Sequence, residues 1–104
     1  MASGAARRRP APLSGIRLLV LDVDGVLTDG RLHYGGAGES HKSFHVRDGY
    51  GIRAVLAAGI AVAVISGRKS PAVTRRCKEL SIRHLYQGVH DKAPVLARLL
   101  ALLE

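Results

Sequence analysis

Two apolar runs dominate the pattern of hydrophobic and polar positions. The first, IRLLVLDV at 16–23, and the second, IAVAVI at 60–65, are rich in branched residues and show little alternation with polar ones. Runs of this kind are typical of strands buried on both faces of a parallel sheet. A shorter apolar segment at 82–86 predicts a third strand. The pattern therefore predicts three buried strands.

Between and after these strands, apolar residues recur at helical spacing. The first helix is predicted over 48–59, where Gly59 suits a helix C-terminus. Ser70 followed by Pro71 predicts the cap and first turn of a second helix. Asp91 predicts the cap of a third helix at 92–103. The residues expected to face inward are Ile52, Val55 and Leu56 in the first helix, and Val73, Cys77 and Leu80 in the second.

Residues 31–46 have a different pattern. Two short polar segments, 31–34 and 40–46, flank the glycine-rich stretch 35–38. Such a stretch predicts a β-hairpin. Inserted after the first strand, it would lie over that strand's end as a lid or a contact between subunits. The whole order predicts an α/β domain with a Rossmann-like parallel sheet and right-handed crossovers.

Composition narrows the class of protein. The chain has 104 residues, of which 47% are hydrophobic, enough for the core of one small domain, predicted over 16–104. Its single cysteine, Cys77, excludes a disulfide framework and a cysteine-rich metal site, and indicates a reducing compartment such as the cytoplasm. Since no apolar run is long enough to span a bilayer, no membrane association is expected.

The charge is strongly basic, at +8. A basic surface suits a phosphorylated or carboxylated substrate, and equally a nucleic acid bound through Arg7, Arg8 and Arg9. With no Trp, one Phe and three Tyr, a stacking platform for bases is lacking, so nucleic-acid binding is not expected. Residues 1–15 have the Ala, Arg, Pro and Ser composition of a transit peptide, but their prolines interrupt an amphipathic helix. They predict a disordered leader.

Polar residues follow each predicted strand. Asp22 and Asp24 end the first strand, Ser66 follows the second, and Lys92 follows the third. The carboxyl ends of parallel strands meet at one edge, where ligands bind in open α/β sheets. A carboxylate nucleophile, a second carboxyl for proton transfer, a hydroxyl and an ammonium together suit phosphoryl transfer through an aspartyl-phosphate. Taken singly, each is also ordinary for a turn or a solvated helix start.

Four motifs carry a resemblance to a known family. They are DVDGVLTDG at 22–30, FHVRDGYGIR at 44–53, ISGRK at 65–69 and HLYQGVHDK at 84–92. In this order they resemble the haloacid dehalogenase superfamily of phosphatases, and within it enzymes that act on a sugar-acid phosphate. The resemblance covers essentially all of residues 16–100.

The resemblance implies a role for each matching residue. Asp22 would be the nucleophile, and Asp24 would protonate the leaving alkoxide and then activate water. Ser66 and Lys92 would hold the transferring phosphoryl group. Mg²⁺ would bind the Asp22 carboxylate and the Asp24 backbone carbonyl. Substrate contacts, partly across subunits of a homotetramer built with the hairpins, would come from Asp24, His45, Val46, Arg47, Asp48, Gly49, Arg53, Arg68, Arg76 and Lys92.

The sequence departs from the family at one motif. These phosphatases carry a further Gly-Asp-Asp on the next strand, which supplies another magnesium ligand, and the 104 residues do not contain it. We therefore expect a chain that is truncated at its C-terminus relative to the family. The alternative is a catalytically silent relative that binds a phosphorylated ligand or serves as an oligomerisation module.

Overall fold

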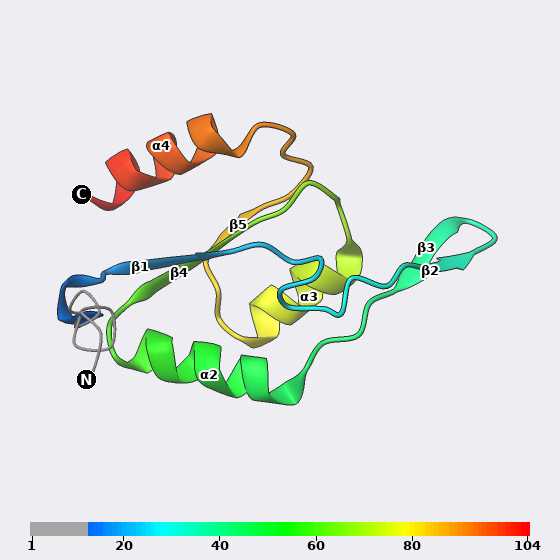
Figure 1. Ribbon diagram of the computed structural model, residues 1–104, viewed down its shortest axis with the longest axis horizontal. Helices are drawn as coiled ribbons and strands as arrows, with labels where there is room; N and C mark the ends of the chain where they lie inside the picture. The colour runs from blue at the N-terminus through cyan, green and yellow to red at the C-terminus, as the bar shows by residue number, and fades with distance from the viewer. Residues whose placement is uncertain (1–12) are drawn as a thin grey trace, which may run out of the picture.

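The computed structural model describes residues 13–104. The predicted leader lies outside the described residues except for its last three, which form the 3-10 helix η1. No helix in the described range is long and apolar enough to cross a membrane. The elements are η1 (Leu13–Gly15), β1 (Leu18–Leu21), β2 (His33–Gly35), β3 (Gly38–His41), α2 (Val46–Ala57), β4 (Ala61–Ile65), α3 (Pro71–Glu79), β5 (His84–Tyr86) and α4 (Lys92–Leu103) (Figure 1).

The three apolar runs form one parallel sheet in the order β1-β4-β5, which confirms the predicted α/β fold. Leu18 lies beside Ala61 in the first pair of strands, and Ala63 beside His84 in the second. The central strand, β4, is buried from Val62 to Ile65, as its wholly apolar sequence predicts. Because all three strands run the same way, their carboxyl ends meet at one edge of the sheet.

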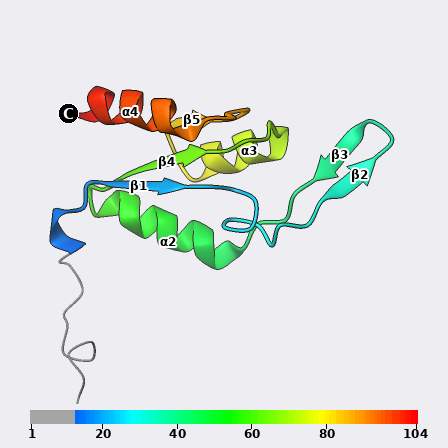
Figure 2. The ribbon, with the colours of Figure 1, turned by 45° about the horizontal axis from the view of Figure 1, so that its top comes forward.

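Helices cover both faces of this sheet. The core cluster joins Val62 and Val64 of β4 to Ile52 of α2 and to Val73 and Cys77 of α3. Burial raises the pKa of the Cys77 thiol, which is therefore neutral and unreactive. Both ribbon views show α4 on the opposite side of the sheet from α2 (Figures 1 and 2). The inward-facing residues predicted for the first two helices all belong to the core or pack against it.

The predicted helix ends are confirmed by their hydrogen bonds. The Ser70 hydroxyl accepts from the Val73 N–H at 3.4 Å, and the Asp91 carboxylate accepts from the Ala93 N–H at 3.4 Å. Gly59 has a φ of +87°, in the left-handed region that glycine tolerates best. The local sequence therefore determines where these helices begin and end.

Two predicted boundaries are wrong. The second arm of the hairpin was expected over 40–46, but β3 ends at His41. The first helix was expected to begin at 48, but α2 begins at Val46. The reason is His45, whose Nδ1 accepts a 3.0 Å hydrogen bond from the Arg47 N–H and so caps the helix. The β2–β3 hairpin itself is confirmed, and it projects from the body of the domain beyond the end of α3 (Figure 2).

Candidate active site

A tight turn at the end of β1 carries both aspartates. The strand ends at Leu21, and the Val23 carbonyl then accepts hydrogen bonds from the N–H groups of residues 26–28, at 2.8 to 3.1 Å. Gly25, with a φ of +79°, supplies the backbone conformation that this turn needs. Asp24 therefore lies in the turn, and its side chain takes different partners from that of Asp22.

Asp22 is paired with Lys92. Lys92 Nζ donates to Asp22 Oδ2 at 2.8 Å, and the Val23 N–H donates to Oδ1 at 2.7 Å. The hydrogen bond from Lys92 lowers the pKa of Asp22 by more than burial raises it. The carboxylate is therefore ionised near neutral pH, which is the form that a nucleophile requires.

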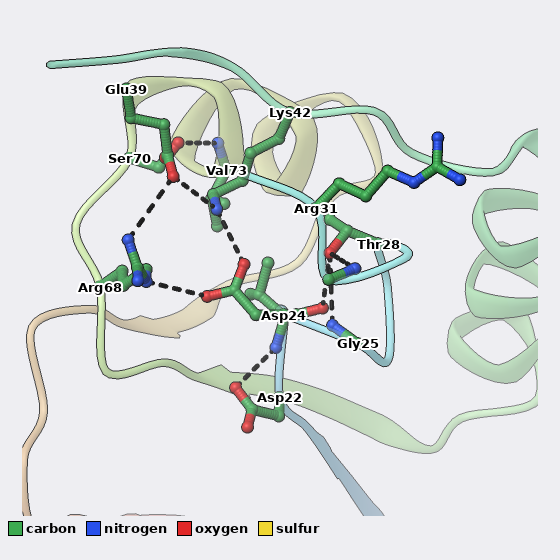
Figure 3. A network of polar contacts seen from close by, with 12 residues as sticks. Asp22, Asp24, Gly25, Thr28, Arg31, Glu39, Lys42, Arg68, Ser70 and Val73 are labelled. Atoms are coloured by element: carbon green, nitrogen blue, oxygen red, sulfur yellow. Dashed lines mark hydrogen bonds and ion pairs between the residues drawn. The ribbon is translucent and has the colours of Figure 1, made fainter. Parts of the chain in front are cut away.

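Asp24 is held by two cations from different parts of the chain. Lys42 Nζ lies 2.8 Å from Asp24 Oδ1, and Arg68 Nε lies 3.6 Å from Oδ2 (Figure 3). The same two cations contact Glu39 on β3, at 3.2 Å and 3.8 Å. Burial lowers the pKa of Lys42, but its hydrogen bonds to Asp24 and Glu39 outweigh that effect and raise it.

Lys42 and Glu39 were not predicted as site residues. In the sequence they are only polar positions on a hairpin arm, and no local signal tells how that hairpin is oriented. Arg68 was expected as a substrate contact, and the structure places it beside Asp24.

Ser66 lies at the same edge of the sheet as Asp22. It is buried, at 2% exposure. Its N–H donates to the Tyr86 carbonyl at 2.8 Å, and its carbonyl accepts from the Val89 N–H at 3.0 Å. These bonds hold the end of β4 against the segment that leads to Lys92. The predicted meeting of the three strand ends is thus present in the backbone.

The predicted substrate residues on α2 and α3 line two hollows. His45 and Asp48 line a pocket of about 330 Å³ together with Thr28 from the aspartate turn. A second hollow, of about 570 Å³, lies between α2 and α3. The Arg47 side chain is exposed at the start of α2. The predicted residues that line the second hollow are Val46, Gly49, Arg53 and Arg76.

Gly49 explains how Arg76 reaches this second hollow. A Cβ built on Gly49 would overlap the Arg76 guanidinium, so the arginine lies directly over the helix backbone. Arg53 instead donates to the Leu80 carbonyl at 3.4 Å. The structure therefore brings Asp22, Lys92, Asp24 and Arg68 to the sheet edge, and groups Arg53 with Arg76 elsewhere.

The donor set suits a hard divalent cation. The Asp22 carboxylate and the Asp24 backbone carbonyl are oxygen donors two residues apart, and oxygen is what Mg²⁺ prefers. Within residues 13–104, no group of three or more His, Cys, Asp or Glu side chains is placed to hold a metal. The residues present fit Mg²⁺ in kind, with water and phosphate oxygens supplying the remaining ligands.

No protein-family model matches the chain, but curated proteins and solved structures do. The 3-deoxy-D-manno-octulosonate 8-phosphate phosphatase KdsC of Escherichia coli K12 is 53% identical over 90 residues, which are 86% of this chain and 48% of that protein. A solved hydrolase of the same superfamily from Legionella pneumophila superimposes with a TM-score of 0.81 at 44% identity, covering 85% of this chain and 48% of the other. This chain belongs to the haloacid dehalogenase superfamily.

Two further superfamily structures were solved with metal ions. One is the cobalt-bound deoxy-D-mannose-octulosonate 8-phosphate phosphatase of Haemophilus influenzae, with a TM-score of 0.84 at 47% identity. The match covers 88% of this chain and 53% of the Haemophilus chain. The other is the 3-deoxy-D-manno-octulosonate 8-phosphate phosphatase of Moraxella catarrhalis, in complex with magnesium, phosphate and KDO, with a TM-score of 0.81 at 45% identity. The match covers 85% of this chain and 51% of the Moraxella chain. The chain spans about half the length of the curated relatives that it matches.

Proposed function

We propose that this chain carries the phosphoryl-transfer site of a Mg²⁺-dependent phosphatase that acts on 3-deoxy-D-manno-octulosonate 8-phosphate. The observation that carries the proposal is the 2.8 Å bond between Lys92 and Asp22, beside a second carboxylate at the sheet edge. Homologues named for this activity, and one crystallised with KDO and phosphate, support the choice of substrate.

The first chemical step forms a bond between an Asp22 oxygen and the substrate phosphorus. The bond from phosphorus to the sugar oxygen breaks, and Asp24 donates a proton to that leaving oxygen. The Lys92 ammonium, which hydrogen-bonds Asp22, is positioned to bind the phosphoryl oxygens as well. The product of this step is an aspartyl-phosphate and the free sugar acid.

The second step hydrolyses the aspartyl-phosphate. Asp24, now unprotonated, takes a proton from a water molecule whose oxygen attacks phosphorus, and the bond to the Asp22 oxygen breaks. Inorganic phosphate leaves and Asp22 is restored. Bound Mg²⁺, held by the Asp22 carboxylate and the Asp24 carbonyl, would offset the negative charge of the phosphoryl group. The buried Ser66 hydroxyl would bind a phosphoryl oxygen.

Arginine side chains would provide substrate selectivity. Arg68 lies beside Asp24, where its guanidinium adds positive charge that favours a substrate carrying both a phosphate and a carboxylate. A guanidinium pairs with two oxygens of a carboxylate or phosphate at once. Arg53 and Arg76 would contribute from the second hollow, together with the segment 45–49 at the start of α2.

The proposal includes a homotetramer built through the hairpins. Val46 and Tyr50 on α2 are 80% and 81% exposed and leave apolar surface for a further contact with an adjoining subunit. Together with Arg53 and Arg76 they border the second hollow, so an adjoining subunit there would complete a substrate site. Light scattering on the purified chain measures the number of subunits directly.

Phosphate release tests the proposed function. The wild-type chain is expected to release phosphate from 3-deoxy-D-manno-octulosonate 8-phosphate in the presence of Mg²⁺, and to stop after EDTA. Arg68→Ala is expected to reduce the preference for this substrate, which carries a carboxylate, over a neutral sugar phosphate. The expected reduction is about 1.5 to 3 kcal/mol, the contribution of a charged hydrogen bond. Arg75→Ala, which removes an exposed arginine on α3, is the control. Absence of Mg²⁺-dependent release would leave the catalytically silent relative as the better description.

A further inference from the structure

Lys42 has the most unusual environment of the charged groups around the aspartate turn. Its side chain is 2% exposed, and its ammonium lies 2.8 Å from Asp24 and 3.2 Å from Glu39. Lysine is almost never fully buried unless it is paired, because removing an ammonium from water costs several kcal/mol. Here two carboxylates offset that cost.

Arg68 closes the cluster into a ring. It contacts the same two carboxylates as Lys42, with Nε 3.6 Å from Asp24 and Nη1 3.8 Å from Glu39. The two positive and two negative charges of these four side chains sum to zero. Lys42 forms the buried side of this ion ring, and Arg68, whose side chain is 48% exposed, forms the outer side (Figure 3).

The ion ring joins three segments that are far apart in the sequence. Asp24 comes from the turn after β1, Glu39 and Lys42 come from the hairpin and the residue following it, and Arg68 follows β4. Interaction with the Tyr34 side chain on β2 raises the pKa of Arg68. The hairpin projects from the domain in both ribbon views (Figures 1 and 2). The ion ring therefore ties the hairpin to the edge of the sheet that carries Asp24 and Arg68.

We propose that Lys42 and Glu39 are positioning residues, which fix the hairpin to the aspartate turn and hold the side chains of Asp24 and Arg68 in place for the reaction. Lys42 holds one oxygen of Asp24 while Arg68 approaches the other, so the carboxylate has a defined orientation. Glu39 in turn holds both cations. The catalytic part of this inference rests on the proposed function; the structural part does not.

Removing the ammonium should release the hairpin. In Lys42→Met, Asp24 and Glu39 lose their buried partner. Hydrogen–deuterium exchange of the amides in β2 and β3, measured with millisecond labelling times, is expected to be about 10- to 100-fold faster than in the wild type, which corresponds to the loss of charged hydrogen bonds. Lys42→Arg, which keeps the charge, should recover most of the protection. Lys78→Met, at an exposed lysine of α3, is the control and should change nothing.

Steady-state kinetics on the same variants separates positioning from folding. Lys42→Met is expected to lower kcat at least tenfold while KM changes less, because Asp24 is misaligned for proton transfer. Unchanged exchange in the hairpin would overturn the proposal. So would faster exchange with an unaltered kcat, because Lys42 would then be structural only. If the wild type itself has no activity but the hairpin responds as expected, the ion ring stands and the proposed function fails.

Glu39→Gln provides a second route in case Lys42→Met does not fold. This variant removes the negative charge of Glu39 on β3, while Lys42 keeps its bond to Asp24. Unchanged amide exchange in β4 and α3 would verify the fold. Faster exchange in the hairpin together with a lowered kcat supports the proposal, and wild-type behaviour in both measurements contradicts it.

Discussion

Lys92 Nζ donates a 2.8 Å hydrogen bond to Asp22 Oδ2 across a separation of 70 positions in the chain. Only the fold makes this contact, because β1 and the loop after β5 end at the same edge of the sheet. The contact gives the site an ionised carboxylate next to an ammonium.

Lys92→Met should make stability less dependent on pH in acid. Lys92 lowers the pKa of Asp22 below the ordinary value of about 3.9. A lowered native pKa stabilises the fold above about pH 4, and the gain is lost as the pH falls through the lowered pKa. Because both side chains are more than 40% exposed, the gain is at most about 1 kcal/mol.

Urea unfolding at neutral pH and in acid measures this effect. The free energy of unfolding of Lys92→Met is expected to lie below that of the wild type at neutral pH, and the two should converge in acid. A difference of the same size at both pH values would mean that Lys92 acts through packing and not through its charge.

Leu99→Ala tests the packing of α4. Leu99 is 1% exposed and is the buried residue of this helix, whereas Leu102 is 68% exposed. Removing a buried leucine side chain typically costs about 2 to 5 kcal/mol. Leu102→Ala should change the free energy of unfolding by no more than about 0.5 kcal/mol. If chemical denaturation showed that the two variants lose the same free energy of unfolding, the position of α4 on the sheet would be contradicted.

The placement of the helices could be predicted from local signals. Ser70, Asp91 and Gly59 mark helix ends through bonds or conformations that involve only near neighbours, and all three predictions are confirmed. The apolar run at 60–65 likewise predicted a buried strand, which β4 confirms, but not its place between β1 and β5. The N-cap role of His45 was missed because histidine is not among the preferred capping residues.

The candidate site was only partly predictable. Asp22 and Lys92 were expected to meet because parallel strands deliver their ends to one edge. The ion ring was missed because the contact of Lys42 with Asp24 depends on how the hairpin packs, which no periodicity encodes. Likewise, sequence alone did not indicate that Arg53 and Arg76 line a hollow different from the one lined by His45.

A pair of glycine substitutions in α2 tests the position of Arg76. Gly51 has open space around it, so Gly51→Ala should raise the free energy of unfolding by about 0.8 to 1 kcal/mol through helix propensity. Gly49→Ala has the same propensity gain, but its Cβ would overlap the Arg76 guanidinium and approach Leu80 Cδ2 at 3.2 Å. Its gain should therefore be smaller or reversed. Equal stabilisation of the two variants in thermal or urea unfolding would show that Arg76 does not lie over Gly49.

The assignment of Asp22 as the nucleophile is tested by a carboxylate-to-amide pair at the same edge of the sheet. Asp22→Asn removes the attacking oxygen anion, whereas Asp91→Asn removes an exposed carboxylate while keeping a side chain that caps α4 equally well. The two variants therefore differ in the chemistry of phosphoryl transfer and not in the kind of charge lost.

The decisive measurement is Mg²⁺-dependent phosphate release from 3-deoxy-D-manno-octulosonate 8-phosphate by the wild type and these two variants. Asp22→Asn is expected to abolish turnover together with formation of the phosphoenzyme. Asp91→Asn should retain most of the wild-type rate, because asparagine caps α4 as aspartate does and Asp91 takes no part in the proposed chemistry. Substantial turnover by Asp22→Asn would contradict the assignment of Asp22 as the group that attacks phosphorus.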